Sequence, residues 1–510
     1  MSYESARDRR GPFVTSCDVV VVGSGASGAV VATELAESGL SVIVLEEGPR
    51  IDAADHGRLR PSESLRHVWR DGGMTVAVGR GDSPTINVTM GRVVGGSSVI
   101  TGGVCFRTPD RVLDTWAHEH GLVDYGAGML DEEFAHVEER IHVEDVPRES
   151  WSRSTKLFDE GAARKGYRLQ PMRRNTKGCR GCGRCNFGCP EQAKLSVDLS
   201  YLPRAVAAGA QVWSHCRVER VRIRGGRAVG VEGRLLNGRG GRPKDRLCVH
   251  ARRVVVACGA WHTPLLLRKS GLGKRSRALG RKMTLHPGFR MLARFPEDIV
   301  VDGWKGAMQG AYSTAFEHEG ITLTDLFIPV SVIGATMPGF GARHLRNARR
   351  MRNMAMFGGM LHDEGGGTVH GALGADPIVS YRMSPRDRAA IPRLLRLMGE
   401  TFLEAGAEVV FPGVLGLEEG LDADAFRRFP FESLPARRLE ASSQHPLGSA
   451  RMGAEPSSSV VDGAGRAWEV DELYVADGSV LPTSLGVNPQ LSIMAVATRM
   501  AWRMRERRLP

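Results

Sequence analysis

Apolar runs that end in glycine or small residues mark the beginning and the middle of the chain. A β-branched run covers residues 18–22, and a second apolar run at 41–45 follows a small-residue stretch that suits a helix up to Ser38. A third run at 253–257 precedes a predicted helix at 264–270. Runs without polar alternation are typical of strands that are buried on both faces of a parallel sheet. The pattern therefore predicts an α/β fold.

Residues 288–440 have a different pattern, in which strand-like and helical segments alternate without a further glycine-rich turn of the first kind. We expect this part to form an α+β domain that faces a substrate. Within it, the apolar stretch 326–342 is interrupted by glycines and prolines, which favours a mobile lid or a pocket wall. A buried irregular connection explains the same stretch equally well.

Composition narrows the class of protein. With 510 residues, 42% of them hydrophobic, the chain can bury large cores and should form one large two-part unit or two to three domains. The first sixteen residues lack an apolar signal region, and no stretch reaches the roughly eighteen apolar residues of a membrane span. We therefore expect a cytoplasmic protein without a membrane span.

The net charge of +12 does not point to nucleic acid, because the arginines are spread along the chain and no nucleic-acid module is present. The basic run 499–508 suits a solvated helix end better than a docking patch. We therefore expect no nucleic-acid partner, and the sequence predicts no oligomeric state.

The first apolar run leads directly into Gly23-Ser24-Gly25-Ala26-Ser27-Gly28. Gly23 permits a tight turn, Gly25 lets the backbone approach a pyrophosphate, and Gly28 lets helix and strand pack. The helix N-terminus that follows offers N–H groups to phosphates. Glu46, after the second run, is suited to accept hydrogen bonds from ribose hydroxyls. This arrangement predicts dinucleotide binding, and the single copy favours a tightly held FAD over NAD.

Two later glycine-containing segments are candidates for further cofactor contacts. The segment 91–98 includes Arg92, Gly95, Gly96 and Ser97. Its backbone N–H groups and hydroxyls can meet an anion or a ring edge, although an ordinary turn has the same composition. Gly259 follows the third apolar run and permits close approach to the cofactor, with simple packing as the alternative.

The C-terminal part carries residues that suit alcohol oxidation. Hydride transfer from an alcohol needs a base for the hydroxyl proton and a hydrogen-bonding neighbour for the oxygen. His445 suits the base because imidazole titrates near neutrality, and the carboxamide of Asn488 suits the neighbour. Pro489 favours a helix N-terminus, whose positive end would stabilise a reduced flavin. Asp477 is a candidate for the ribityl or pyrophosphate region.

Each of these residues also has an ordinary interpretation when it is taken alone. His445 then fits a loop histidine, Asn488 a helix cap and Asp477 a strand-end cap. Their combination with the nucleotide-binding turn favours the catalytic interpretation.

Nine cysteines are present, and four of them lie in one short run. Cys179, Cys182, Cys185 and Cys189 have the spacing C-x2-C-x2-C-x3-C-P of bacterial ferredoxin-type runs, which predicts an iron-sulfur cluster. The fourth cysteine of such runs serves a second cluster in two-cluster ferredoxins, so Cys189 would have to fold back. Structural zinc and free thiols are the alternatives, whereas a disulfide is disfavoured in a reducing cytoplasm.

Together these motifs resemble those of the glucose-methanol-choline (GMC) oxidoreductase family over nearly the whole chain. The resembling segments are residues 23–28 with Glu46, 91–98, 254–264, 445–453, Asp477-Gly478 and Asn488-Pro489-Gln490. The resemblance implies a Rossmann-like FAD-binding domain with an inserted α+β substrate domain. It also implies a His445–Asn488 pair in front of the isoalloxazine, and contact of adenine with the backbone at Val218. Ile100 stands where some members carry a histidine bonded to flavin, so noncovalent FAD is implied.

On this resemblance we expect the FAD-binding domain to consist of three separate parts of the chain. Residues 15–110 form the first part, 196–287 the second, and 441–510 the C-terminal catalytic part. We expect residues 111–195 to form a helical insert with the cysteine loop at 179–190, and 288–440 to form the substrate domain.

The expected reaction is FAD-dependent oxidation of a small-molecule alcohol to an aldehyde or ketone, with oxygen or another electron acceptor, such as the predicted cluster, taking the electrons. The cysteine run resembles long-chain alcohol oxidases and flavin sugar dehydrogenases with an iron-sulfur centre, and residues 106–109 favour the first group. An alternative is oxidation of a primary hydroxyl of an amino sugar in aminoglycoside biosynthesis. A flavin or iron-sulfur redox carrier, and a lyase or photoenzyme with the same cradle, are alternatives of other classes.

Overall fold

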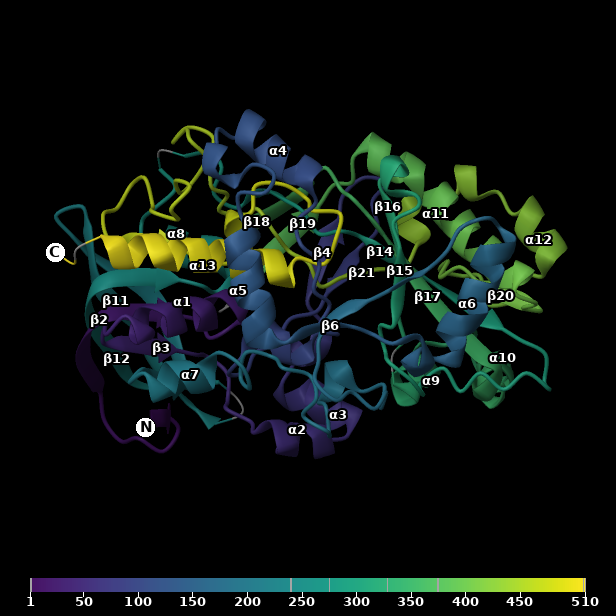
Figure 1. Ribbon diagram of the computed structural model, residues 1–510, viewed down its shortest axis with the longest axis horizontal. Coiled ribbons are helices and arrows are strands. Elements are labelled where there is room, and N and C mark those ends of the chain that lie inside the picture. Colours follow the sequence, from purple (N-terminus) through teal and green to yellow (C-terminus); the bar gives the residue numbers. More distant parts are fainter. Residues whose placement is uncertain are drawn as a thin grey trace.

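The computed structural model describes residues 2–238, 241–274, 276–327, 329–373, 376–507 and 509. Within these ranges, one sheet of eight strands and one of twelve strands organise the two halves of the molecule (Figure 1). A small sheet pairs β6 (Val143–Asp145) with β8 (Arg173–Asn175). The mixed α/β class predicted from the apolar runs is confirmed.

The first sheet contains the apolar runs that the sequence pattern identified. Val19–Val22 pair in parallel with Val42–Leu45 on one side and with Arg253–Val256 on the other. The strand order is β1 (Ser2–Ser5), β9 (Gln211–Ser214), β3 (Val42–Leu45), β2 (Phe13–Val22), β12 (Arg242–Val256), β11 (Arg227–Asn237) and β10 (Cys216–Arg224), with β22 (Leu473–Val475) paired to β12. The strands next to β2 are parallel, as expected for strands buried on both faces.

The second sheet is antiparallel in most of its pairings and draws on three parts of the chain. Its order is β13 (Arg281–Met283), β18 (Gly367–Leu373), β19 (Asp376–Tyr381), β4 (Val76–Gly79), β5 (Ile86–Val88), β21 (Ala441–Ser443), β14 (Gly288–Arg294), β17 (Met354–Leu361), β16 (Ile321–Asp325), β15 (Ala311–Ser313) and β7 (Gln170–Pro171), with β20 (Val409–Phe411) paired to β14. Strands β4, β5 and β21 come from outside residues 288–440, so segments that also serve the cofactor half contribute to this sheet.

The helices cover both sheets. They are α1 (Ala26–Glu37), α2 (Ala53–Arg58), α3 (Pro61–His67), α4 (Asp110–Glu119), α5 (Asp131–Ile141), α6 (Arg153–Arg164), α7 (Leu202–Ala207), α8 (Gly259–Lys269), α9 (Val330–Thr336), α10 (Ala342–Arg349), α11 (Pro385–Glu404), α12 (Ala423–Arg428) and α13 (Gln490–Glu506). The helix expected at 264–270 is α8, which begins earlier, at Gly259. Within the described ranges, no helix is long and apolar enough to cross a membrane.

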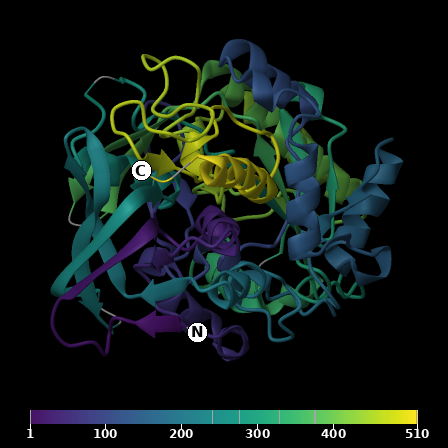
Figure 2. The ribbon, with the colours of Figure 1, turned by 60° about the vertical axis from the view of Figure 1, so that its left-hand side comes forward.

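Helix α13 packs against α1, and Figure 2 shows the two side by side. Small residues in α1, including Ala29 and Ala32, are completely buried and allow this close approach. The C-terminal helix is therefore placed on the helix that follows the glycine-rich turn, which brings the start of α13 to the nucleotide-binding end of the first sheet.

The stretch 326–342, expected as a lid or a pocket wall, forms α9 and its flanking turns; Ile328 lies outside the described residues. Ile333 is completely buried and packs with Met337, Met354 and Phe411 in a separate apolar cluster. None of the described residues of this stretch lines the large cavity described below. Ile333 and Met337 are buried, whereas Thr336 and Phe340 are exposed, so the stretch is a surface helix with one packed side rather than a buried irregular connection.

Candidate functional site

A cavity of about 520 Å³ opens at the carboxyl ends of the parallel strands. Residues that directly follow β2, β3, β12 and β22 line it, and the loops before α13 close one end. Ligands of open α/β sheets bind at this edge. The volume lies within the range of small-molecule and cofactor sites, roughly 300–1,000 Å³.

The first glycine-rich turn lines this cavity with Gly23, Gly25 and Ser27. Gly23 has φ of +104°, and a Cβ there would overlap the carbonyl oxygen of Ala257. Gly28 does not line the cavity; a Cβ at Gly28 would overlap the carbonyl oxygen of Gly23. The backbone thus requires glycine for the turn and for helix–strand packing, as predicted, and Gly28 serves the packing rather than a ligand contact.

Glu46 faces the same cavity with a carboxylate that is already hydrogen-bonded. Its Oε2 accepts the Ser24 hydroxyl at 2.7 Å and its Oε1 accepts the Gly48 N–H at 2.8 Å. The Ser24 hydroxyl oxygen also accepts the Gly95 N–H at 3.1 Å. Burial raises the pKa of Glu46. Ser24, for which the sequence predicted no role of its own, therefore connects Glu46 to the second glycine-rich loop.

The second glycine-rich loop meets the first one directly. A Cβ at Gly96 would lie 2.6 Å from the Cα of Gly25, so Gly96 must be glycine, whereas a Cβ at Gly25 would meet nothing closer than 3.9 Å. Gly96 and Ser97 line the cavity, whereas Gly95 and Arg92 do not. Gly95 instead provides the left-handed turn, with φ of +96°. Arg92 and Gly95 therefore do not face the cavity, and their contact with a cofactor stays a prediction.

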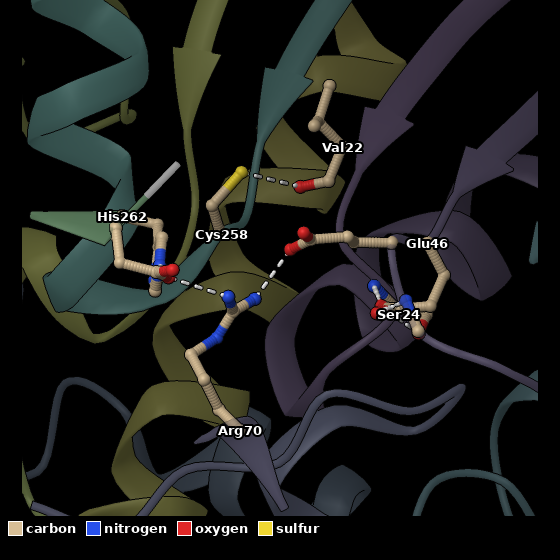
Figure 3. A network of polar contacts seen from close by, with 9 residues as sticks. Val22, Ser24, Glu46, Arg70, Cys258 and His262 are labelled. Carbon is tan, nitrogen blue, oxygen red and sulfur yellow. Dashed lines mark hydrogen bonds and ion pairs between the residues drawn. The ribbon is translucent and has the colours of Figure 1, made fainter. Parts of the chain in front are cut away.

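An ion-pair network contributes Arg70, Glu47 and His262 to the cavity wall (Figure 3). Arg70 donates to Glu47 at 2.6 Å and to Asp376 at 2.8 Å, and His262 lies 3.0 Å from the same Asp376 oxygen. Glu47 follows β3, His262 is on α8, and Asp376 begins β19 of the second sheet. The network therefore ties the two sheets together beside the nucleotide cradle. No sequence motif indicated it, because its members are far apart along the chain.

Three further predicted positions lie on the cavity wall: Val218 on β10, Gly259 at the start of α8, and Gly478 after β22. Asp477 also lines the cavity, but protein donors occupy its carboxylate. It accepts the Gly259 N–H at 2.9 Å and the Thr263 hydroxyl at 2.6 Å through Oδ2, and a backbone N–H at 2.7 Å through Oδ1. This geometry supports the capping interpretation of Asp477.

His445 and Asn488 come together at the cavity. Nδ2 of Asn488 lies 3.1 Å from Nε2 of His445, although 43 residues separate them in the chain. Asn488 does not cap α13; the N-cap residue is Pro489. In the described part of the chain, Oδ1 of Asn488 is buried without a hydrogen-bond partner. Pro489 and Gln490 line the cavity as well, and Gln490 accepts the Thr101 hydroxyl at 3.1 Å.

A second histidine, His286, lies behind His445. The Nδ1 atoms of the two rings are 3.3 Å apart, and Nε2 of His286 accepts the N–H groups of Leu485 and Gly486. Burial lowers the pKa of His445 to about 4 and that of His286 well below its usual value. Both imidazoles are therefore neutral at neutral pH. Sequence reasoning missed His286, and the only signal was its position before a proline, as in His445-Pro446.

Two carboxamides, Gln309 and Gln444, line the same cavity together with Thr101. No motif pointed to Gln309, because it lies in a loop of the second half. Gln444 directly precedes His445, and this adjacency was the available signal.

The four cysteines of the predicted metal run converge on a small second cavity together with Arg174 and Lys194. All four are free thiols; Cys185 is buried and the other three are partly exposed. The Cys182 thiol donates a hydrogen bond to the sulfur of Cys189, which lowers the pKa of Cys189 to about 5.

The side-chain arrangement does not form a metal site. Among the residues that the structure describes, no group of three or more His, Cys, Asp or Glu side chains is placed to hold a metal ion. The prediction that Cys179, Cys182, Cys185 and Cys189 ligate iron-sulfur or zinc is therefore not supported by this geometry. The spacing brought the sulfurs to one cavity but did not determine what they bind.

Comparisons with known proteins agree with the fold. Two domain models described as GMC oxidoreductase match residues 17–288 and 368–497. An uncharacterized GMC-type oxidoreductase of Mycobacterium tuberculosis is 39% identical over 96% of this chain and 76% of its own length. Long-chain-alcohol oxidase FAO1 of Arabidopsis thaliana is 28% identical over 98% of this chain and 68% of its own. The 6'''-hydroxyparomomycin C oxidase of Streptomyces lividus is 26% identical over 94% and 90%.

Among solved structures, pyridoxine 4-oxidase from Mesorbium loti superimposes with a TM-score of 0.72 over 96% of this chain and 100% of its own. Its sequence identity is 18%, so this likeness speaks for the fold alone.

Proposed function

Because the chain belongs to the GMC oxidoreductase family, an FAD-dependent class, we propose that it oxidises a CH–OH group to a carbonyl. The observation that carries this proposal is the His445–Asn488 pair, 3.1 Å apart, in the cavity that also holds the glycine-rich turn. A base and a hydrogen-bonding neighbour are the groups that alcohol oxidation requires of the protein.

The described residues fit FAD. A Cβ on Gly96 would meet the Gly25 backbone, so the two loops touch here. A Cβ on Gly25 would meet nothing closer than 3.9 Å within the protein, so the N-terminal end of α1 is open to a phosphate. FAD, when bound, supplies the two-electron acceptor for the hydride of the alcohol. Ile100, which would have to be histidine for the covalent link known in the family, does not line the cavity, so we propose noncovalent binding.

In the proposed reaction, His445 accepts the hydroxyl proton at Nε2 while Asn488 orients the alcohol oxygen. The low pKa of His445 keeps the ring neutral and therefore able to accept a proton at any pH above about 4. The unpartnered Oδ1 of Asn488 leaves this carboxamide free to bind a second group in the cavity.

The position of the proton on His286 affects which nitrogen of His445 can act as the base. Its Nε2 accepts two backbone N–H groups, so a neutral His286 carries its proton on Nδ1, which faces Nδ1 of His445. A neutral His445 that accepts this contact would carry its proton on Nε2, which faces Nδ2 of Asn488, a group that can only donate. The contacts with His286 and with Asn488 therefore require opposite tautomers of His445. We expect the two rings to separate before proton transfer, so that His445 holds its proton on Nδ1 and presents Nε2.

Two relatives suggest different alcohols. The long-chain-alcohol oxidase favours an aliphatic primary alcohol. The 6'''-hydroxyparomomycin C oxidase favours a hydroxyl of an amino sugar, and the carboxamides of Gln309 and Gln444 in the cavity support this second class because they can bind neighbouring hydroxyls. For electron acceptance we propose oxygen or an external acceptor, and we derive no step through a metal cluster.

The decisive experiment is anaerobic stopped-flow reduction of the FAD-loaded enzyme by a panel containing a long-chain primary alcohol, a secondary alcohol and an amino sugar with a free primary hydroxyl. His445→Ala should slow reduction about 10²- to 10⁴-fold with FAD still bound, since general base catalysis contributes that much. His318→Ala, at an exposed site, is the matched control.

Reduction that is equally fast in His445→Ala would remove the base from the proposal. If no alcohol reduces the wild-type flavin, the redox-carrier alternative is favoured over alcohol chemistry.

A further inference from the structure

The cysteine cavity contains two buried cations, which distinguishes it from a chance cluster of thiols. Arg174 is completely buried and Lys194 is 3% exposed, and both line the cavity with the four cysteines. Burying a cation without a partner is strongly unfavourable. The positive charge therefore has to be matched by hydrogen-bond acceptors or by negative charge at the sulfurs.

The contacts of Arg174 show where negative charge is needed. Nη2 donates to the sulfur of Cys185 at 2.9 Å and Nε donates to the carbonyl of Gly102 at 2.8 Å. Within the described residues, Nη1 is buried and donates to no acceptor. The Cys185 sulfur is thus held by a hydrogen bond from a buried cation.

Cys182 and Cys189 form a separate pair within the cavity. The thiol of Cys182 donates to the sulfur of Cys189, and both residues are partly exposed, whereas Cys185 is buried. The glycines between them fix the loop against other segments: a Cβ on Gly183 would overlap the carbonyl of Trp304, and one on Gly188 would overlap the carbonyl of His56. The loop therefore holds two partly exposed cysteines whose side chains contact each other.

We propose that this loop is a two-electron thiol–disulfide site, in which Cys182 and Cys189 form a reversible disulfide while Arg174 holds Cys185 apart. The oxidant is a hydroperoxide. One sulfur of the pair attacks the peroxide to give a sulfenic acid and release water, and the other thiol then displaces a second water to form the S–S bond. In total, two thiols and one hydrogen peroxide give one disulfide and two waters. A dithiol reductant reverses the step.

Lys194 and Arg174 connect the cysteine loop to residues 99–102, which follow the second glycine-rich loop. The Nζ of Lys194 donates to the carbonyls of Val99 at 2.7 Å, Thr101 at 2.8 Å and Cys185 at 2.9 Å. Arg174 adds the bond to Gly102. Thr101 and Gly102 line the large cavity. Disulfide formation therefore affects the residues that support Thr101 and Gly102 at the cavity wall. The proposed disulfide does not depend on which alcohol is oxidised.

The experiment uses the full-length FAD-loaded protein, reduced with dithiothreitol and then freed of it. Hydrogen peroxide should convert the pair to a disulfide, detected as a Cys182–Cys189 cross-linked peptide and as the loss of two titratable thiols, and dithiothreitol should restore them. Cys182→Ser should abolish the cross-link. Cys17→Ser, at a partly exposed cysteine outside the loop, should leave it unchanged.

Metal analysis of protein that was purified anaerobically without chelators provides the opposing result. Stoichiometric iron with sulfide, or stoichiometric zinc, together with four thiols protected from alkylation would overturn the disulfide proposal in favour of a metal centre. Wild-type protein that is free of metal but gives only overoxidised or unlinked cysteines would also overturn it, and this result does not depend on the folding of any variant.

Discussion

Residue spacing predicted both the nucleotide cradle (residues 23–28, Glu46 and 95–97) and the cysteine loop (179–190). In the structure, the two kinds of spacing determine different properties. In the cradle, Gly23, Gly28 and Gly96 are required by backbone contacts that a Cβ would obstruct. In the cysteine loop, the glycines are fixed by packing in the same way, but the sulfurs are constrained only to share a cavity. Glycine spacing therefore reports a backbone conformation, whereas cysteine spacing reports proximity and leaves the chemistry open.

The largest effect that would test this comparison is expected from Gly28→Ala in the cradle. The added methyl group would overlap the Gly23 carbonyl, so strand and helix must separate and FAD should be lost entirely, with a lower melting temperature. Gly25→Ala is the matched variant, because its Cβ would meet nothing closer than 3.9 Å within the protein. We expect it to fold normally and to bind FAD more weakly, measured as FAD per chain after gel filtration. Equal loss of fold in both variants would contradict the separate roles.

The cradle could be predicted from the sequence because its signals are local. The strands at 18–22 and 41–45, the turn between them and Glu46 all lie within thirty residues and follow backbone rules. His445 and Asn488 were selected for their chemistry, and the packing of α13 on α1 provides the reason why they meet. His286 and the Arg70 network could not be predicted, since they depend on contacts across more than one hundred residues.

The cysteine side of the comparison is tested by Arg174→Met. Removal of the buried cation that donates to the Cys185 sulfur should destabilise the protein by about 1.5–3 kcal/mol in urea unfolding, since a hydrogen bond from a charged group is lost. The loss should be smaller in a Cys185→Ala background, because the partner is already absent. Arg58→Met, on the exposed face of α2, is the control. A neutral or stabilising Arg174→Met would mean that the hydrogen bond from Arg174 to Cys185 does not hold the loop.

A third effect concerns the histidine pair at the catalytic end of the cradle. His286→Phe removes the N–H that faces Nδ1 of His445, so His445 should be protonated more easily and its pKa should rise from about 4. The neutral imidazole is the base, so the acidic limb of the pH–rate profile of flavin reduction should move to higher pH. A change of ~1.4 kcal/mol in the protonation free energy of His445 moves this limb by about one pH unit. His362→Gln, at a half-buried histidine that does not contact His445, should leave the limb in place. An unmoved limb in His286→Phe would show that the pair does not couple.

The smallest effect is expected at the ion pairs that join the two sheets beside the cradle. The Asp376 side chain is 38% exposed, and Arg70 keeps its contact with Glu47, so Asp376→Asn should destabilise by no more than about 1 kcal/mol. The hydrogen bond with His262 and the charge of Arg70 lower the pKa of Asp376 to about 2. A depressed carboxylate pKa stabilises the folded state fully above the unfolded value, about 3.9, and less as pH falls towards 2. The difference between wild type and variant in urea midpoint should therefore be constant from pH 7 to pH 5. A large difference, or one that disappears by pH 5, would mean that Asp376 contributes through FAD retention rather than through its ion pair.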